Sequence, residues 1–190
     1  MKRYLPLLFA VIFTSNAFTK EQIPIEHFWC ESAMTSGSLS PDGRYFAAMI
    51  PASGPKCSID ADADDDQSAR VLLVRDLQTN KSEVLSGTSS KARIVWFTWL
   101  SDSRIAFYRQ PQAGLDAYSM WAINVDGTKP KLLVAGKWED GRPTGANLMD
   151  ILYDDDKHVL VAYNKRRPTV TDIYKLNIFS GKLTMVAKDP

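Results

Sequence analysis

The chain has 190 residues, of which 45% are hydrophobic and 24% are charged, and its formal net charge is +1. Ordinary apolar content and a small net charge exclude an intrinsically disordered chain. The balance of basic and acidic residues also argues against a polybasic nucleic-acid-binding protein. The length fits one domain, or two small ones.

Residues 1–17 have the pattern of a secretory signal peptide. Lys2 and Arg3 supply the positive start, residues 4–13 are apolar, and small residues precede a cleavage point between Ala17 and Phe18. A membrane anchor is the alternative, but this apolar stretch is about half of the roughly 20 residues that a membrane-spanning helix needs. We therefore expect a periplasmic or secreted protein that has no membrane contact after cleavage.

The chain contains two cysteines, Cys30 and Cys57. An oxidising compartment permits a disulfide between them. The bridge would close a loop of about 27 residues and contribute roughly 3 kcal/mol on the loop-entropy model. Two unpaired, buried thiols are the alternative. Neither cysteine has the partner that catalytic thiol chemistry needs.

From residue 39 onward, short β-type runs alternate with turn residues, and three related units follow one another, roughly 31–87, 94–135 and 148–188. A period of about 50 residues with four short strands in each unit is typical of propeller blades. We therefore predict an all-β fold. Residues 18–38 form an N-terminal segment, and residues 39–190 form an incomplete β-propeller of about three four-stranded antiparallel blades.

Two sets of positions recur across the units. The first set follows a polar turn and opens an apolar strand: Arg44, Arg104 and Lys157. The second set follows the next apolar run: Asp76, Asn124 and Asn177. The spacing between the two sets is 12 residues longer in the first unit. We assign the insertion to residues 51–66, which are rich in Pro and Gly and then acidic.

Turn residues separate the predicted strands. Pro41-Asp42-Gly43 fits a tight turn, and Asp126-Gly127 has the composition of a two-residue type I′ hairpin. Thr79-Asn80 and Ser180-Gly181 place Asn or Gly where a left-handed backbone is tolerated.

Apolar stretches between the turns predict the core. Residues 71–74 and 159–162 are continuous apolar runs, as expected of strands that are covered on both faces. The aromatic residues Trp96, Phe97 and Trp99 are expected to pack between neighbouring blades rather than to bind a ligand.

Several segments resemble the start of the propeller in bacterial prolyl oligopeptidase family proteins: IPIEHFW (23–29), LSPDGRYFA (39–47), VRDLQTNKSEVL (74–85) and WLSDSRIAF (99–107). Residues 164–183 are similar to the family pattern N-K-R-x-P…D-[VI]-Y-x-[LV]-[ND]…-G. The matching residues are Asn164, Lys165, Arg166, Pro168, Asp172, Ile173, Tyr174, Leu176, Asn177 and Gly181.

The resemblance implies a propeller that caps an α/β-hydrolase domain with a Ser–Asp–His triad and admits only short peptides. This chain stops at Asp189-Pro190 and contains no G-x-S-x-G nucleophile motif. Its two histidines, His27 and His158, are the only candidates for a histidine base, and His158 opens an apolar strand, where a packed or edge histidine is expected. We therefore expect no catalytic residue and no enzyme activity from the chain as it stands.

Two charged runs invite other interpretations. The acidic residues between Asp60 and Asp66 begin like a calcium loop, but a Gly at its sixth position and a Glu at its twelfth are missing. A solvated hairpin tip explains this run without a metal. The basic trio Lys165-Arg166-Arg167 is expected in a hairpin loop as surface charge. No metal or other cofactor is expected.

The sequence thus favours an exported, non-catalytic propeller fragment similar to the substrate-gating domain of a prolyl-oligopeptidase-like serine peptidase. Its expected partners are peptides or a missing hydrolase domain, and its open blade faces are expected to self-associate. Two alternatives stay open. One is a TolB-like periplasmic propeller that acts as a protein-binding scaffold, and the other is a truncated, inactive gene product.

Overall fold

The structure is a computed structural model, and it describes residues 34–52, 70–86, 93–110 and 117–190. Over these residues the fold is all-β, with no helix. The cleavage point between Ala17 and Phe18, the Cys30–Cys57 disulfide and the acidic run at 60–66 lie outside the described residues and stay predictions.

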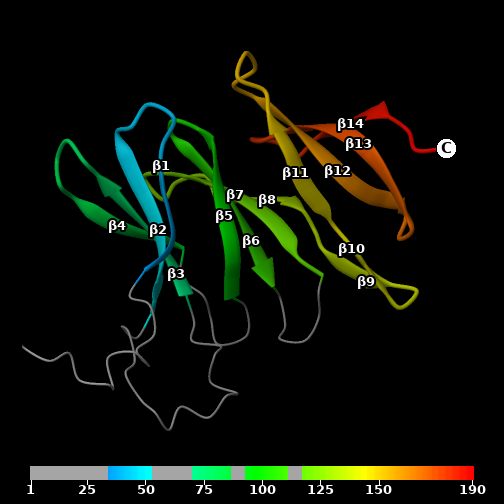
Figure 1. Cartoon of the computed structure of the whole chain (residues 1–190), viewed down its shortest axis with the longest axis horizontal. Coiled ribbons are helices and arrows are strands. Elements are labelled where there is room, and N and C mark those ends of the chain that lie inside the picture. Colours follow the sequence, from blue (N-terminus) through cyan, green and yellow to red (C-terminus); the bar gives the residue numbers. More distant parts are fainter. Residues whose placement is uncertain (1–33, 53–69, 87–92, 111–116) are drawn as a thin grey trace, which may run out of the picture.

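Three four-stranded antiparallel sheets lie side by side, each with its strands in chain order (Figure 1). Blade 1 consists of β1 (Thr35–Leu39), β2 (Tyr45–Pro51), β3 (Arg70–Asp76) and β4 (Ser82–Ser86). Blade 2 consists of β5 (Arg93–Ser101), β6 (Arg104–Gln110), β7 (Ser119–Asn124) and β8 (Lys131–Val134). Blade 3 consists of β11 (Ala146–Ile151), β12 (His158–Arg167), β13 (Val170–Asn177) and β14 (Leu183–Ala187). The predicted incomplete propeller of three blades is confirmed.

A small hairpin that the sequence analysis did not predict lies between blades 2 and 3. It pairs β9 (Lys137–Glu139) with β10 (Arg142–Thr144). Its two-residue turn, Asp140-Gly141, has positive φ angles of 49° and 71°. Positive φ at both central residues is the requirement of a type I′ turn, and an Asp-Gly pair meets it at low cost.

The type I′ turn predicted at Asp126-Gly127 is wrong. Only Gly127 has a positive φ, 74°, and its N–H donates to the Asn124 carbonyl at 2.9 Å. The Asn124 N–H in turn donates to the Thr128 carbonyl at 3.0 Å, so three residues form the loop. A three-residue loop needs a left-handed residue only at its last position, where Gly127 stands.

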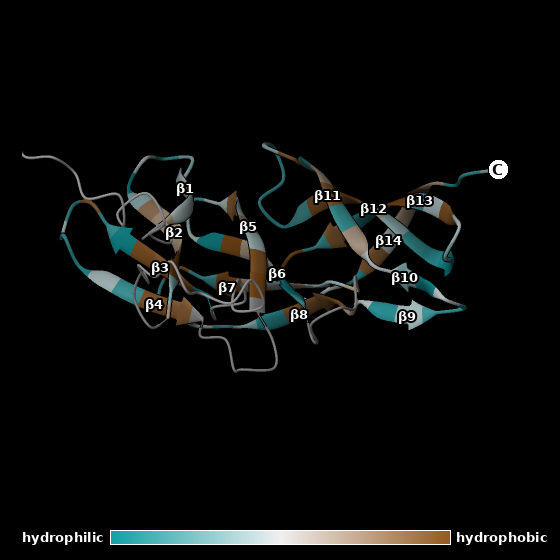
Figure 2. Cartoon of the chain, turned by 60° about the horizontal axis from the view of Figure 1, so that its bottom comes forward, coloured by the Kyte–Doolittle hydropathy of each residue, from teal (hydrophilic) through white to brown (hydrophobic). Residues whose placement is uncertain are grey.

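Blade 2 is packed between the other two blades, and alternation along β6 explains how. Ile105 and Phe107 belong to a core shared with blade 1, whereas Ala106 and Tyr108 belong to a core shared with blade 3. Because successive side chains of a strand point to opposite faces, one apolar strand supplies both cores. Figure 2 shows apolar stretches in strands of all three blades.

The runs 71–74 and 159–162 are buried on one face only. The buried residues are Leu72 and Val74 of β3 and Val159 and Val161 of β12. The residues that alternate with them, such as Leu160, are only half-buried. The prediction that both faces are covered is wrong for these strands. The reason is that blades 1 and 3 each have a single neighbouring blade among the described residues.

The aromatic stripe of β5 divides between two environments. Phe97 and Trp99 are buried in the core between blades 1 and 2, as predicted, and Trp99 Nε1 donates to the Ser38 carbonyl of β1 at 3.4 Å. Trp96 is 44% exposed, and its ring lies 5.3 Å from that of Tyr108. The prediction is wrong for Trp96: alternation along β5 places it on the face opposite Phe97 and Trp99, and it stays exposed there beside Tyr108.

The recurring positions are equivalent between blades with a shift of one residue in blade 2. In each blade, the residue that follows the second recurring position (Asp76, Asn124 or Asn177) donates its backbone N–H to a carbonyl at or next to the first recurring position. The bonds run from Leu77 to Arg44, from Val125 to Ser103, and from Ile178 to Lys157. Ser103 therefore takes the place of Arg44, and Arg104 lies one residue further along, directly opposite Asn124.

The described residues include no helix long and apolar enough to cross a membrane.

Candidate functional site

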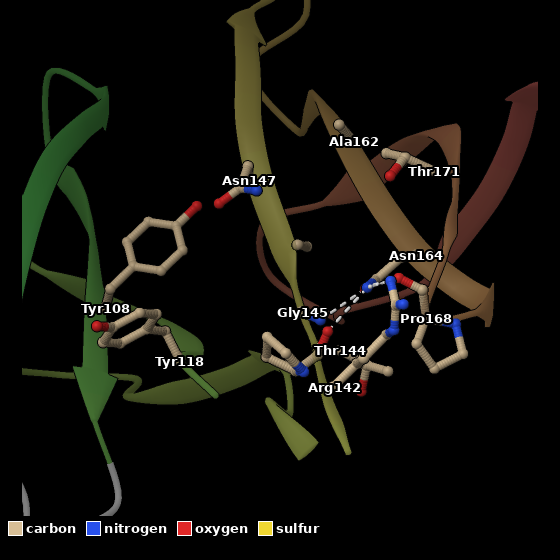
Figure 3. Close-up of a pocket in the computed structure, with 12 residues that line it drawn as sticks. Tyr108, Tyr118, Arg142, Thr144, Gly145, Asn147, Ala162, Asn164, Pro168 and Thr171 are labelled. Carbon is tan, nitrogen blue, oxygen red and sulfur yellow. Dashed lines mark hydrogen bonds between the residues drawn. The ribbon is translucent and has the colours of Figure 1, made fainter. Parts of the chain in front are cut away.

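A hollow of about 490 Å³ opens between blades 2 and 3, at the end of the blades where β6 and β12 finish and β7 and β13 begin. Figure 3 shows Tyr108 and Tyr118 on its blade 2 side, and Arg142, Asn164 and Pro168 on its blade 3 side. A volume in this range is typical of sites that hold small molecules, which span about 300–1,000 Å³.

The side chain of Asn164 holds one wall of the hollow together. Its Nδ2 donates to the carbonyls of Pro143, at 2.9 Å, and Pro168, at 3.1 Å, and its Oδ1 accepts the Gly145 N–H at 2.9 Å. These bonds join β12 to β10, to the β10–β11 connection and to the β12–β13 turn. One amide thus satisfies three backbone groups and fixes the wall before any ligand binds.

The two tyrosines of the opposite wall are also held in place. The Tyr108 hydroxyl accepts the backbone N–H of Leu148 in β11 at 3.0 Å, which ties blade 2 to blade 3. Burial raises the pKa of Tyr108 above its ordinary value, so its hydroxyl stays protonated at neutral pH. The Tyr118 backbone lies against Gly136, where a Cβ atom would stand 2.5 Å from the Tyr118 carbonyl carbon. Gly136 is therefore required for this close approach.

Three polar side chains that line the hollow, Arg142, Asn147 and Thr171, make no side-chain hydrogen bond or ion pair within the part of the chain that the structure describes. The described residues around the hollow include no carboxylate, histidine or cysteine. The wall therefore presents one guanidinium, one amide and one hydroxyl beside two aromatic rings. This set of groups suits the binding and orientation of an anionic ligand.

The basic trio Lys165-Arg166-Arg167 belongs to β12 and not to a hairpin loop, so that prediction is wrong. Arg166 forms two hydrogen bonds with the fully buried carboxylate of Asp172, at 2.9 and 3.2 Å. The hydrogen bonds from Arg166 hold the pKa of Asp172 below its ordinary value. The Asp189 N–H also donates to Asp172, at 3.0 Å, so the pair fastens the C-terminal residues to blade 3.

Arg104 is a buried cation, 1% exposed, at the boundary between blades 2 and 3. Its Nε donates to the Ile178 carbonyl at 3.0 Å, and its terminal nitrogens donate to Asn124 Oδ1 and to the Lys129 carbonyl. The guanidinium carbon lies 4.9 Å from the ring centre of Phe179. Burial lowers the pKa of Arg104, but arginine remains charged in proteins. All of these hydrogen-bond partners are neutral.

His158 opens β12 and is half-buried. Its Nδ1 lies 2.9 Å from Asp155 Oδ1, and its Nε2 lies 3.3 Å from the Asn177 amide. Lys175 Nζ is 2.7 Å from Asp155, and hydrogen bonds from Lys175 and then His158 hold the pKa of Asp155 well below its usual range. The histidine and its carboxylate resemble two members of a hydrolase triad. In this blade, however, the second ring nitrogen faces an amide rather than a hydroxyl nucleophile.

Comparisons with known proteins support the fold. No family model and no curated protein matches the chain. Among solved structures, an oligogalacturonate lyase in complex with manganese is similar at a TM-score of 0.54 and 16% identity, over 84% of this chain and 43% of that one. TolB from Acinetobacter baumannii has a TM-score of 0.47 and 14% identity, over 80% of this chain and 31% of that one.

An acylaminoacyl peptidase from Pyrococcus horikoshii has a TM-score of 0.37 and 14% identity, over 82% of this chain and 32% of that one. This chain spans less than half the length of each of these three structures. The likeness to the lyase shows a propeller-type fold, and at 16% identity it shows the fold alone.

Sequence reasoning did not single out the hollow. Of its lining residues, Asn164 and Pro168 entered only as parts of a family pattern, and Tyr108, Tyr118 and Arg142 were not considered. One signal for Arg142 was present: Asp140-Gly141 marks a hairpin turn, and Arg142 directly follows it. No short-range signal indicates that this hairpin faces two tyrosines from the preceding blade.

Proposed function

We propose that this chain is a non-catalytic propeller segment that restricts the access of substrates to a prolyl-oligopeptidase-like serine peptidase domain. The observation that carries the proposal is the pre-formed hollow at one end of two stacked blades. Its walls present a guanidinium, an amide, a hydroxyl and two aromatic rings to a ligand. Support also comes from the similarity of residues 164–183 to the family pattern, because Asn164 of that pattern holds one of these walls.

A propeller of this kind selects substrates by size. Its blades are joined by apolar cores and by hydrogen bonds such as that from the Leu148 N–H to the Tyr108 hydroxyl, so we expect a rigid opening at the blade ends. A short peptide passes a rigid opening, whereas a folded protein does not. The chemistry would belong to a hydrolase domain with a Ser–Asp–His triad, for which this chain supplies no nucleophile motif.

The signal-peptide pattern of residues 1–17 supports a periplasmic or extracellular location for this function. The activity and the manganese named for the oligogalacturonate lyase are not extended to this chain, because the similarity is one of fold.

The proposal is tested on the gene and then on its product. A reading frame that continues into a hydrolase domain with G-x-S-x-G supports it, whereas further blades followed by a stop favour a TolB-like scaffold. The longer product should react with a fluorophosphonate probe at one serine, and the present chain should not. The longer product should also cleave a short peptide faster than the same peptide sequence inserted in a folded protein. Stoichiometric labelling of a serine in the present chain would contradict the assignment.

A further inference from the structure

The hollow between blades 2 and 3 is built before a ligand arrives. Asn164 fixes the Pro143 and Pro168 carbonyls on one wall, and the Tyr108 hydroxyl is fixed on the other by the Leu148 N–H. The backbone of the walls is therefore fixed in advance, and binding has to order only the exposed side chains that reach the ligand.

The charge of the hollow favours an anion. Arg142 is the charged side chain among its described lining residues, and it has no carboxylate partner in the part of the chain that the structure describes. The contrast with the other arginines of this region supports a ligand role. Arg104 and Arg166 are committed to internal partners, which leaves the guanidinium of Arg142 available. A guanidinium binds a carboxylate through two parallel hydrogen bonds.

The remaining groups indicate what is attached to that carboxylate. The Asn147 side chain carries one acceptor oxygen and a donor nitrogen, which is the complement of a peptide group, and Thr171 adds a hydroxyl. The rings of Tyr108 and Tyr118 offer flat apolar surface for a side chain. Trp96 packs against the Tyr108 ring at 5.3 Å, so its fluorescence is placed to report binding.

We propose that the hollow binds the C-terminal carboxylate of a short peptide, with Arg142 as the counter-ion, Asn147 and Thr171 on the last peptide group, and the two tyrosines against its side chain. The choice of a peptide rests on the proposed function. The preference for a carboxylate rests on Arg142 and the lack of acidic residues among the described lining residues, and it does not depend on that function.

The test uses the tripeptide Ala-Pro-Phe, as the free acid and as the C-terminal amide, in equilibrium dialysis against the full chain. Dialysis measures bound peptide whatever the association state of the protein. The acid should bind about two- to fivefold more tightly than the amide, as expected of one charge-assisted contact to an exposed arginine. Added salt should reduce this difference. Arg142→Gln should bind both forms equally, and Lys137→Gln, a matched loss of charge on the same hairpin, should bind as the wild type does.

A second measurement locates the site in the unmodified chain. Phenylglyoxal modifies accessible arginines, and mass spectrometry reports each one separately. The free acid should slow the modification of Arg142 but not of Arg75, which pairs with Asn80 away from the hollow. The amide should protect neither. This comparison is made within one sample of wild-type protein, so a variant that fails to fold does not affect it.

Each alternative outcome has a defined meaning. Equal binding of acid and amide, or equal protection of Arg142 and Arg75, would overturn the carboxylate site. Binding of glucuronate in place of the tripeptide would retain a carboxylate but overturn the peptide as its source. A gene without a hydrolase domain would refute the proposed function and leave the dialysis result unchanged, so the two failures are distinguishable.

Discussion

Replacing Arg104 with methionine tests how strongly blades 2 and 3 are joined. Methionine retains much of the volume of arginine but removes the guanidinium. Three acceptors then lose their donor: the Ile178 and Lys129 carbonyls and Asn124 Oδ1. The Ile178 carbonyl belongs to blade 3, so the substitution removes a link between blades as well as bonds within blade 2.

The expected loss follows from these contacts. A hydrogen bond to a charged group contributes about 1.5–3 kcal/mol, and a buried acceptor left without a donor costs about 1–3 kcal/mol. Release of the buried charge offsets part of this loss, because the guanidinium no longer has to be desolvated. We expect Arg104→Met to lower the free energy of unfolding by about 2–4 kcal/mol, a large fraction of the roughly 5–15 kcal/mol of a typical domain.

The matched control is Arg44→Met in blade 1. Arg44 also bonds to the residue at the second recurring position, through a 3.0 Å ion pair with Asp76, but its side chain is 41% exposed. Exposed ion pairs contribute about 0–1 kcal/mol, so this variant should unfold near the wild type. Urea unfolding followed by tryptophan fluorescence at low protein concentration measures both. Equal destabilisation by the two substitutions, or none from Arg104→Met, would refute the assignment of Arg104 as a link between blades.

Three further predictions follow from the same contacts. Asp172→Asn should lose the ion pair with Arg166 and destabilise the chain above the ordinary carboxyl pKa of 3.8, and the difference from wild type should shrink as the pH falls through the lowered folded-state pKa, as urea titrations at several pH values would show. Gly136→Ala should cost about 1–3 kcal/mol, and more than Gly145→Ala, because the added Cβ would lie 2.5 Å from the Tyr118 backbone instead of 3.2 Å; thermal melts of both variants check this order. The isolated chain should self-associate through its outer blade faces in size-exclusion chromatography with light scattering, and a monodisperse monomer with a sharp melt would contradict this.

Local patterns predicted the turns that depend on a single backbone angle. A tight turn was expected at Gly43 and a left-handed backbone at Asn80 and Gly181, and their φ angles are 72°, 57° and 76°. Such positions are readable because the preference of Gly and Asn for positive φ does not depend on the rest of the fold. The type I′ turn was assigned to the wrong Asp-Gly pair because the same dipeptide serves two loop lengths, and the strands on either side decide between them.

The register between blades was not readable from residue identity. Arg44 and Arg104 have the same residue type and similar neighbours, yet hydrogen bonding places Arg44 level with Ser103. A shift of one residue reverses which face of the strand a side chain occupies. This shift leaves Arg44 exposed in an ion pair with Asp76, whereas Arg104 is buried among neutral partners. Sequence alignment alone does not reveal that difference.

The hollow was not predicted because separate parts of the chain build it. Its walls come from the end of β6, the residue before β7, the β9–β10 hairpin, the start of β11 and the β12–β13 region. Each segment alone has ordinary features, such as a tyrosine in a strand or an arginine after a turn. Only the stacking of blade 2 on blade 3 brings them together, and that stacking depends on long-range apolar contacts.

The family-like pattern at residues 164–183 has a structural explanation in this chain. Asn164 holds three backbone groups, Arg166 and Asp172 form an interior ion pair, and Gly181 takes a left-handed turn. These contacts stabilise one blade. The solved lyase structure with a similar fold does not extend its activity to this chain, because one fold hosts unrelated activities. The pattern therefore informs the architecture of blade 3, and it does not extend to Arg142, which lines the hollow from the β9–β10 hairpin.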